Sequence, residues 1–244
     1  MKPIIRLPVR FAKKILSDRA FFSVMETMTA AGGDDIAAHA LLLSRFRPKN
    51  QALARFYLNQ RLAEWKAFTD VLKSNGFPRR ILEIGTGLGG SAYSLSRMAQ
   101  AGSLIVTVDN SPLAREYVAI YQRPGRTRIV NVIGDSHAHE TLEHVSNALG
   151  PGPVDLLYID GDHSYEGVKA DFESYKRFCR PGGLIAFHDI HPDHAHSTGT
   201  QTACDSGEVF KFWNELKSLH PRYQEFIETP TQDGFGIGLI EYAG

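Results

Sequence analysis

The chain has 244 residues with 27 lysine or arginine and 27 aspartate or glutamate side chains, so its formal net charge is zero and its bulk charge gives no sign of a nucleic-acid partner. The length suits one α/β domain with an elaboration, and no apolar stretch approaches the roughly 20 residues that span a bilayer. The two cysteines, Cys179 and Cys204, lack CxxC spacing, which argues against a disulfide scaffold and for a reducing cytoplasm.

Residues 1–78 are predicted to form an N-terminal helical extension, a cap or lid that precedes the main domain. Within it, residues 50–74 carry apolar and aromatic side chains at helical spacing, namely Leu53, Phe56, Tyr57, Leu62, Trp65, Phe68 and Leu72. Two interpretations remain open for these side chains: core packing against a sheet, or a lid over an active site. The break at Asn75-Gly76-Phe77-Pro78 ends the extension.

From Arg79 onward, strand-like and helix-like segments alternate regularly, which is typical of βαβ units and a parallel sheet. Strands are predicted at 81–84, 103–109, 128–133, 154–159 and 184–187. Helices are predicted at 91–99, 112–121, 139–149, 165–178 (closed by R-P-G-G at 180–183) and 208–219, the last one after a polar loop at 190–207.

The chain ends in two further predicted strands, at 223–228 and 236–242, with a plausible hairpin loop between them. We therefore predict an α/β fold with a Rossmann-like, doubly wound sheet of seven strands. Its terminal strands form an antiparallel pair, and the whole domain covers residues 79–244, after the N-terminal helical extension.

The first predicted strand runs into a glycine-rich turn, R-I-L-E-I-G-T-G-L-G-G-S at 80–91. Glycine lets the backbone approach a ligand closely, and the amides at the start of the next helix favour an anionic or polar group. The turn also satisfies the dinucleotide pattern G-x-G-x-x-G, which leaves NAD open. Glu83, two residues before the first glycine, would repel a pyrophosphate and attract the cationic amino acid part of S-adenosylmethionine, so it favours the methyl donor.

Five successive strands end at or near an acidic residue. Ligands of open α/β sheets bind at the carboxyl ends of the strands, so these acids are expected to share one edge: Glu83, Asp109, Asp135, Asp160 and Asp189. Asp109 can accept both hydroxyl protons of a ribose, which supports an adenosine cofactor without choosing between NAD and S-adenosylmethionine. Helix capping is the alternative explanation for any single acid among them.

The pattern E-I-G-T-G-x-G-G resembles motif I of the class I S-adenosylmethionine-dependent methyltransferases. The resemblance implies a methyltransferase whose cofactor is S-adenosylmethionine. G-D-S at 134–136 resembles the segment that recognises adenine in that family. The implied cofactor-binding residues are Glu83, Gly85, Thr86, Gly87, Gly89, Asp109, Asn110, Asp135 and Ser136.

Two further stretches, L-L-Y-I-D-G-D-H-S-Y-E-G-V and R-P-G-G-L-I-A-F-H-D-I, look like those of the metal-dependent small-molecule O-methyltransferases. Within that group, the similarity is greatest to the branch that methylates macrolide and aminocoumarin sugars. It implies that Asp160 and Asp189 share a divalent metal ion, magnesium or manganese. It also implies that Asp160 and His163 are catalytic, with His163 as the general base; capping of the following helix is the alternative for His163.

The third metal ligand departs from that branch, which has two acids after the fifth strand where this chain has His188-Asp189-Ile190. Ile190 cannot bind a metal, whereas His188 can, and imidazole favours manganese, iron, nickel or zinc over magnesium. Further histidines and an acid follow nearby in the chain as weaker candidates, namely His191, Asp193, His194 and His196.

The resemblance implies transfer of a methyl group to a hydroxyl of a small molecule, a sugar or another natural product. A homo-oligomer is compatible with it. Two alternatives remain open from the sequence: an NAD(P)-dependent Rossmann oxidoreductase, and a binding module that keeps S-adenosylmethionine without catalysis.

Overall fold

The computed structural model describes residues 58–112 and 127–244. Most of the predicted N-terminal extension, up to residue 57, and nearly all of the predicted helix at 112–121 lie outside the described residues. Within the two described ranges, no helix combines the length and apolar character that crossing a membrane requires.

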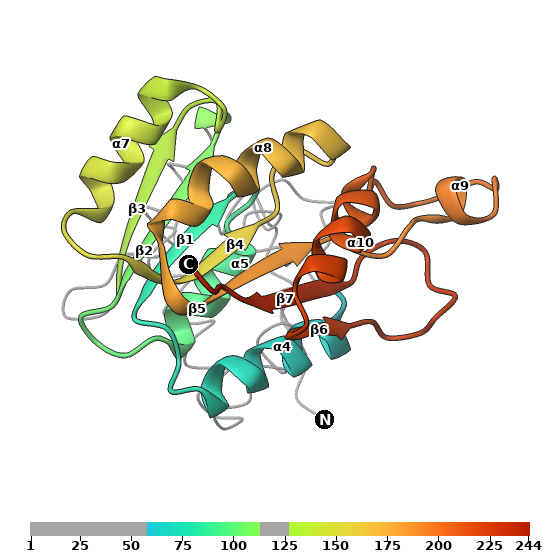
Figure 1. Ribbon diagram of the computed structural model, residues 1–244, viewed down its shortest axis with the longest axis horizontal. Helices are drawn as coiled ribbons and strands as arrows, with labels where there is room; N and C mark the ends of the chain where they lie inside the picture. The colour runs from blue at the N-terminus through green and yellow to red at the C-terminus, as the bar shows by residue number, and fades with distance from the viewer. Residues whose placement is uncertain (1–57, 113–126) are drawn as a thin grey trace, which may run out of the picture.

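Seven strands form one sheet in the order β3-β2-β1-β4-β5-β7-β6 (Figure 1). Strands β1 to β5 are parallel, while β7 runs antiparallel to both of its neighbours, β5 and β6. The predicted seven-stranded sheet with an antiparallel terminal pair is therefore confirmed. The strand bounds are β1 (Arg80–Ile84), β2 (Leu104–Asp109), β3 (Arg128–Ile133), β4 (Val154–Ile159), β5 (Cys179–His188), β6 (Tyr223–Phe226) and β7 (Ile237–Glu241).

Helices cover both faces of the sheet, so the described part of the molecule has three layers (Figure 1). One face packs against α7 (His139–Leu149), α8 (Tyr165–Tyr175) and α10 (Val209–Leu219), and the other against α4 (Leu62–Ser74) and α5 (Gly90–Met98). Two short helices complete the described elements, η2 (Lys176–Phe178) and α9 (His194–Ser197). Parallel strands buried on both faces read as nearly continuous apolar runs, as β4 does here.

The aromatic side chains of α4 pack as core against the sheet. Trp65 and Phe68 are wholly buried, and their ring centroids lie 6.0 and 5.9 Å from the ring of Tyr158 on β4. Full burial of each such side chain contributes about 1.5–3 kcal/mol. Core packing is thus the interpretation that holds for the described aromatic residues of the extension, and α4 is an integral part of the fold.

Several predicted boundaries differ from the structure. The R-P-G-G segment does not simply close the preceding helix, because β5 already begins at Cys179 and the pairing of β4 with β5 shifts register between Val154 and Leu156. Backbone hydrogen bonds between Gly182 or Gly183 and Tyr242, of 2.7 and 2.8 Å, hold this irregular stretch in the sheet. Similarly, α4 begins only at Leu62, and the loop at 190–207 contains the short helix α9.

Candidate active site

The glycine turn connects the carboxyl end of β1 to the start of α5, at the point where the strand order reverses between β1 and β4. Gly85 has φ of +87°, and a Cβ at this position would overlap the backbone oxygen of Asp160. Only glycine therefore allows the turn to lie directly against the end of β4. Strand reversals of this kind are where doubly wound sheets bind their ligands.

Asp109, the last residue of β2, shapes this turn. Its Oδ2 accepts hydrogen bonds from the backbone amides of Thr86 and Gly87, at 3.0 and 2.7 Å, and its Oδ1 accepts one from Ser111 at 2.7 Å. The sequence predicted a carboxylate for ribose hydroxyls and gave no sign of this bracing role. A carboxylate has about four acceptor positions, so both roles are compatible.

A cavity of about 420 Å³ lies beside the turn, at the carboxyl ends of β1 to β4. Its lining includes predicted residues from all four strand ends, namely Gly85, Gly87, Asp109, Asn110, Asp135, Ser136 and Asp160. Sequence reasoning missed other residues of the lining, which adjoin those acids in the chain: Ile84, Val108, Gly134, His137, Gly161 and Asp162. The predicted residues Glu83, Thr86 and Gly89 do not line this cavity.

Glu83 is wholly buried on β1, where it pairs in register with Thr107 and Tyr158. Its Oε1 accepts a hydrogen bond from the hydroxyl of Ser91, and its Oε2 has no partner in the described parts of the chain. Burial raises the pKa of Glu83 to about 8 against the opposing Ser91 hydrogen bond. Without a bound cation, this carboxyl is therefore protonated at neutral pH, which the sequence did not reveal.

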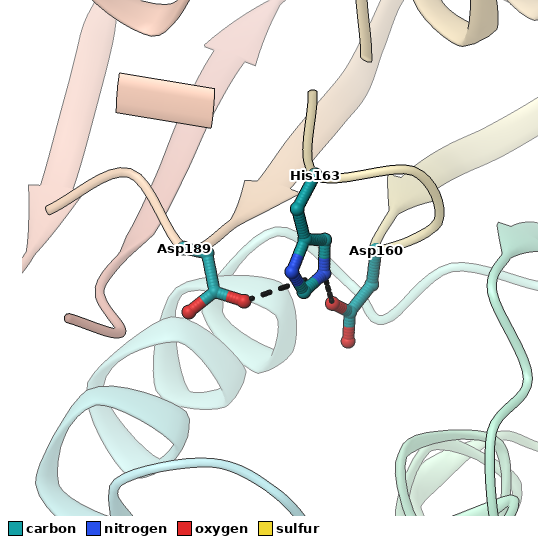
Figure 2. A group of neighbouring side chains, drawn as sticks. All are labelled: Asp160, His163 and Asp189. Carbon is teal, nitrogen blue, oxygen red and sulfur yellow. Dashed lines mark ion pairs between the residues drawn. The ribbon is translucent and has the colours of Figure 1, made fainter. Parts of the chain in front are cut away.

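Figure 2 shows three side chains that converge beyond the ends of β4 and β5: Asp160, His163 and Asp189. The Nε2 of His163 lies 3.7 Å from Oδ1 of Asp160 and 3.5 Å from Oδ2 of Asp189. One ligand atom from each residue fits within 4.8 Å of the others. The structure thus brings together the two predicted metal-binding acids and the predicted base, although Asp160 and Asp189 lie 29 positions apart in the sequence.

The loop before α10 fixes the orientation of the His163 ring. The Nδ1 of His163 lies 2.5 Å from the carbonyl oxygen of Asp205, and the amide of Glu208 donates to the His163 carbonyl at 2.7 Å. A carbonyl only accepts, so Nδ1 carries the proton and Nε2 is the atom left to face the two acids. Gly207 permits this contact, because a Cβ there would overlap the backbone of His163.

Charge within the cluster shifts the pKa values of its members. Burial opposes ionisation of Asp160, but His188 and His163 outweigh it and lower the pKa of Asp160 to about 2. Burial likewise opposes protonation of His163, but the hydrogen bond with Asp160 and the charge of Asp189 raise its pKa to about 9. A cation on the two carboxylates would cancel much of that charge and favour the neutral imidazole.

His188 lies beneath the cluster, 2 % exposed. Its Nδ1 is 3.1 Å from Oδ1 of Asp160 and 3.0 Å from Oδ2 of Asp189, and its Nε2 has no partner in the described ranges. His188 therefore bridges both acids, and its predicted role as third ligand stays a prediction. The nearby His191, His194 and His196 contact their own loop and the β6–β7 connection, with Pro230, Thr231 and Asp193 among their partners.

The residues of the cluster fit a divalent metal ion. The carboxylates of Asp160 and Asp189 and the Nε2 of His163 share one small volume, and a backbone carbonyl holds Nδ1 of His163, so this imidazole can serve either as a ligand or as a base beside the ion. Metal-binding histidines commonly donate their other N–H to such an acceptor. The set contains two oxygen donors and a nearby imidazole, which suits manganese at least as well as magnesium.

The sequence of this chain is similar to those of known methyltransferases and of uncharacterised proteins. Residues 82–190 match a family model described as a methyltransferase domain. Over 170 residues the chain is 28 % identical to the catechol O-methyltransferase of Mycobacterium tuberculosis, covering 66 % of this chain and 72 % of that protein. It is 32 % identical over 117 residues to an uncharacterised protein of Acanthamoeba polyphaga mimivirus, covering 44 % of this chain and half of that one. An uncharacterised Sinorhizobium fredii protein matches at 29 % identity, but the chain spans only 17 % of its length.

Solved structures share the fold. An O-methyltransferase from Bacillus cereus in complex with SAH superposes with a TM-score of 0.56 at 22 % identity, covering 84 % of this chain and 97 % of that one. An O-methyltransferase from Streptomyces achromogenes involved in tomaymycin synthesis, in complex with SAM, gives 0.58 at 17 % identity, covering 97 % and 95 %. Residues 82–190 thus match a methyltransferase domain, and the chain shares its fold with solved O-methyltransferases, among them complexes with SAH and SAM.

Proposed function

We propose that this protein transfers the methyl group of S-adenosylmethionine to a hydroxyl of a small molecule, with assistance from a divalent metal ion. The observation that carries the proposal is the convergence of Asp160, His163 and Asp189 at the edge of the cofactor cavity, which Asp160 also lines. A sulfonium cofactor supplies an electrophilic methyl carbon, and a divalent ion lowers the pKa of a hydroxyl that it binds. The chain must supply binding, orientation and proton transfer.

The cavity residues would bind the cofactor. Asp109 would accept hydrogen bonds from the ribose hydroxyls, while Asp135, with Asn110 and Ser136 beside it, would recognise the adenine. Glu83 lies buried below the turn with one unpartnered oxygen, and it would ionise to pair with the ammonium of the methionine part. Gly85, Gly87 and Gly89 would let the turn approach the ligand, and Thr86 would complete the turn between two of them.

Asp160 and Asp189 would hold the metal, with His188 bridging them from below. His163 would act as the general base, because its Nε2 faces the two carboxylates while Nδ1 is fixed on the Asp205 carbonyl. A base within reach of a metal-held hydroxyl removes its proton while the methyl group is transferred. Placement of the acceptor oxygen in line with the methyl carbon would contribute as much as the strength of the base.

The acceptor we propose is a sugar or another polyhydroxylated natural product, in keeping with the branch that the two motifs resemble. The names of the relatives point to small-molecule hydroxyls as well, since one is a catechol O-methyltransferase and another takes part in tomaymycin synthesis. We place the reaction in the cytoplasm, where the two free thiols of Cys179 and Cys204 are stable.

Calorimetry with S-adenosylhomocysteine, NADH and manganese tests the proposal. We expect S-adenosylhomocysteine and manganese to bind, and NADH not to bind. Tight NADH binding without a response to S-adenosylhomocysteine would instead favour the oxidoreductase alternative. Turnover is then measured with labelled S-adenosylmethionine against a panel of sugars, catechols and glycosylated natural products.

A further inference from the structure

Ser206 touches the metal-binding cluster from a loop that carries none of its members. It lies just before α10, and its side chain is wholly buried. The hydroxyl donates a hydrogen bond of 2.8 Å to Oδ1 of Asp189 and accepts one of 3.0 Å from the backbone amide of Phe235. A serine hydroxyl has one proton, so the incoming amide directs that proton to Asp189.

This contact acts on the residue of the cluster whose backbone is least relaxed. Asp189 has φ of +59°, in the left-handed region that few residues other than glycine and asparagine or aspartate adopt. With Oδ1 held by Ser206, the other oxygen, Oδ2, faces His188 at 3.0 Å and His163 at 3.5 Å. Tilting of the carboxylate plane would lengthen the Ser206 hydrogen bond, so the serine fixes the plane in which the second oxygen faces the cluster.

The backbone of Phe235, whose amide donates to Ser206, is itself held by further hydrogen bonds. The Phe235 carbonyl accepts a hydrogen bond of 2.9 Å from the amide of His191, two residues after Asp189 in the chain. The following amide, that of Gly236, donates at 3.0 Å to Oε2 of Glu64, a buried residue of α4. Ser206 therefore transmits the position of the β6–β7 connection to the metal-binding acid.

We propose that Ser206 is a positioning residue, which orients the Asp189 carboxylate for the metal ion. This inference rests on the proposed function, because it assumes that Asp189 binds a metal. Residues that hydrogen-bond to metal-binding carboxylates hold them in the orientation that the metal requires. Loss of such a residue typically lowers metal affinity by about 10–100-fold. Ser206 would strengthen metal binding in this way without touching the metal, the cofactor or the acceptor.

The test is calorimetric titration of manganese into the full chain and into Ser206→Ala. We expect the variant to bind manganese about 10–100-fold more weakly while binding S-adenosylhomocysteine as before. Ser94→Ala is the matched control, because Ser94 is also a buried serine whose hydroxyl accepts a hydrogen bond. Its donor is Nε1 of Trp65 on α4, at 2.8 Å, and not a group of the cluster. This control should leave manganese affinity unchanged.

Equal manganese affinity in Ser206→Ala and the unsubstituted protein would overturn the inference alone. If the unsubstituted protein bound no manganese, the metal part of the proposed function would fail, and this inference with it. Should Ser206→Ala not bind S-adenosylhomocysteine, and so not be folded, Ser206→Cys keeps a donor of weaker strength at similar size. Its manganese affinity should then be intermediate, and an unchanged affinity would count against the inference.

Discussion

Replacing Glu83 by glutamine should change how stability depends on pH. In the ligand-free protein the pKa of Glu83 is raised from 4.5 to about 8, first of all by burial. Between these values the unfolded chain carries a carboxylate at this position, whereas the folded chain holds a proton there. Folding thus takes up a proton, and the free energy of unfolding should fall as pH rises.

The magnitude follows from the linkage relation. One pH unit corresponds to about 1.36 kcal/mol for one proton, so between pH 5 and pH 7 Glu83 alone should lower stability by about 2.7 kcal/mol. Glutamine cannot titrate, and its amide oxygen can keep the hydrogen bond from Ser91. Glu83→Gln should therefore lose this part of the pH dependence. The free energy of unfolding of the variant, relative to that of the unsubstituted protein, should rise by about 2.7 kcal/mol from pH 5 to pH 7.

Urea unfolding at the two pH values measures the effect, since the difference between the proteins cancels the contributions of all other groups. Glu140→Gln is the control, because that side chain is 83 % exposed and should leave the pH dependence as it is. Saturating S-adenosylhomocysteine should also reduce the difference, because its ammonium favours the ionised carboxylate. Parallel pH profiles of Glu83→Gln and the unsubstituted protein in the absence of ligand would refute the reasoning.

Three further substitutions test the site. Asp160→Asn should abolish manganese binding and prevent recovery of turnover when manganese is added back to chelator-treated protein; full activity after chelation would contradict a metal role. His163→Ala should keep manganese binding and slow turnover by about 10²–10⁴-fold, and loss of manganese binding would instead make it a ligand. Gly85→Ala should lose S-adenosylhomocysteine binding in calorimetry, because its Cβ would overlap the Asp160 backbone, and retained affinity would show that the turn can move.

Much of this architecture was predictable because strand periodicity and the acids at the strand ends are local features of the sequence. The helix at 139–149 and the strands at 128–133 and 154–159 have the predicted bounds. The convergence of Asp160 and Asp189 followed from the adjacency of parallel strand ends. The least accurate bounds belong to the R-P-G-G segment, whose place in the sheet depends on Tyr242, far away in the chain.

The parts of the site that escaped prediction depend on contacts between distant loops. Ser206 and the Asp205 carbonyl reach Asp189 and His163 only because the segment before α10 folds back over the strand ends. No spacing rule encodes such a contact. The burial of Glu83 could not be predicted either. The sequence indicates that this acid lies on a strand, but it does not indicate whether the side chain is exposed to solvent.

The contacts of α4 with the rest of the domain limit how far the chain can be shortened from its N-terminal side. Glu64 accepts hydrogen bonds from the amides of Glu228 and Gly236 and from the side chain of Gln232, at 3.1, 3.0 and 2.6 Å. A protein that began at Arg79, or at residue 82 where the family match begins, would lose this shared acceptor and leave the buried amide of Gly236 without it. We therefore expect a stable folded piece of this chain to include α4, which begins at Leu62, twenty residues before the family match.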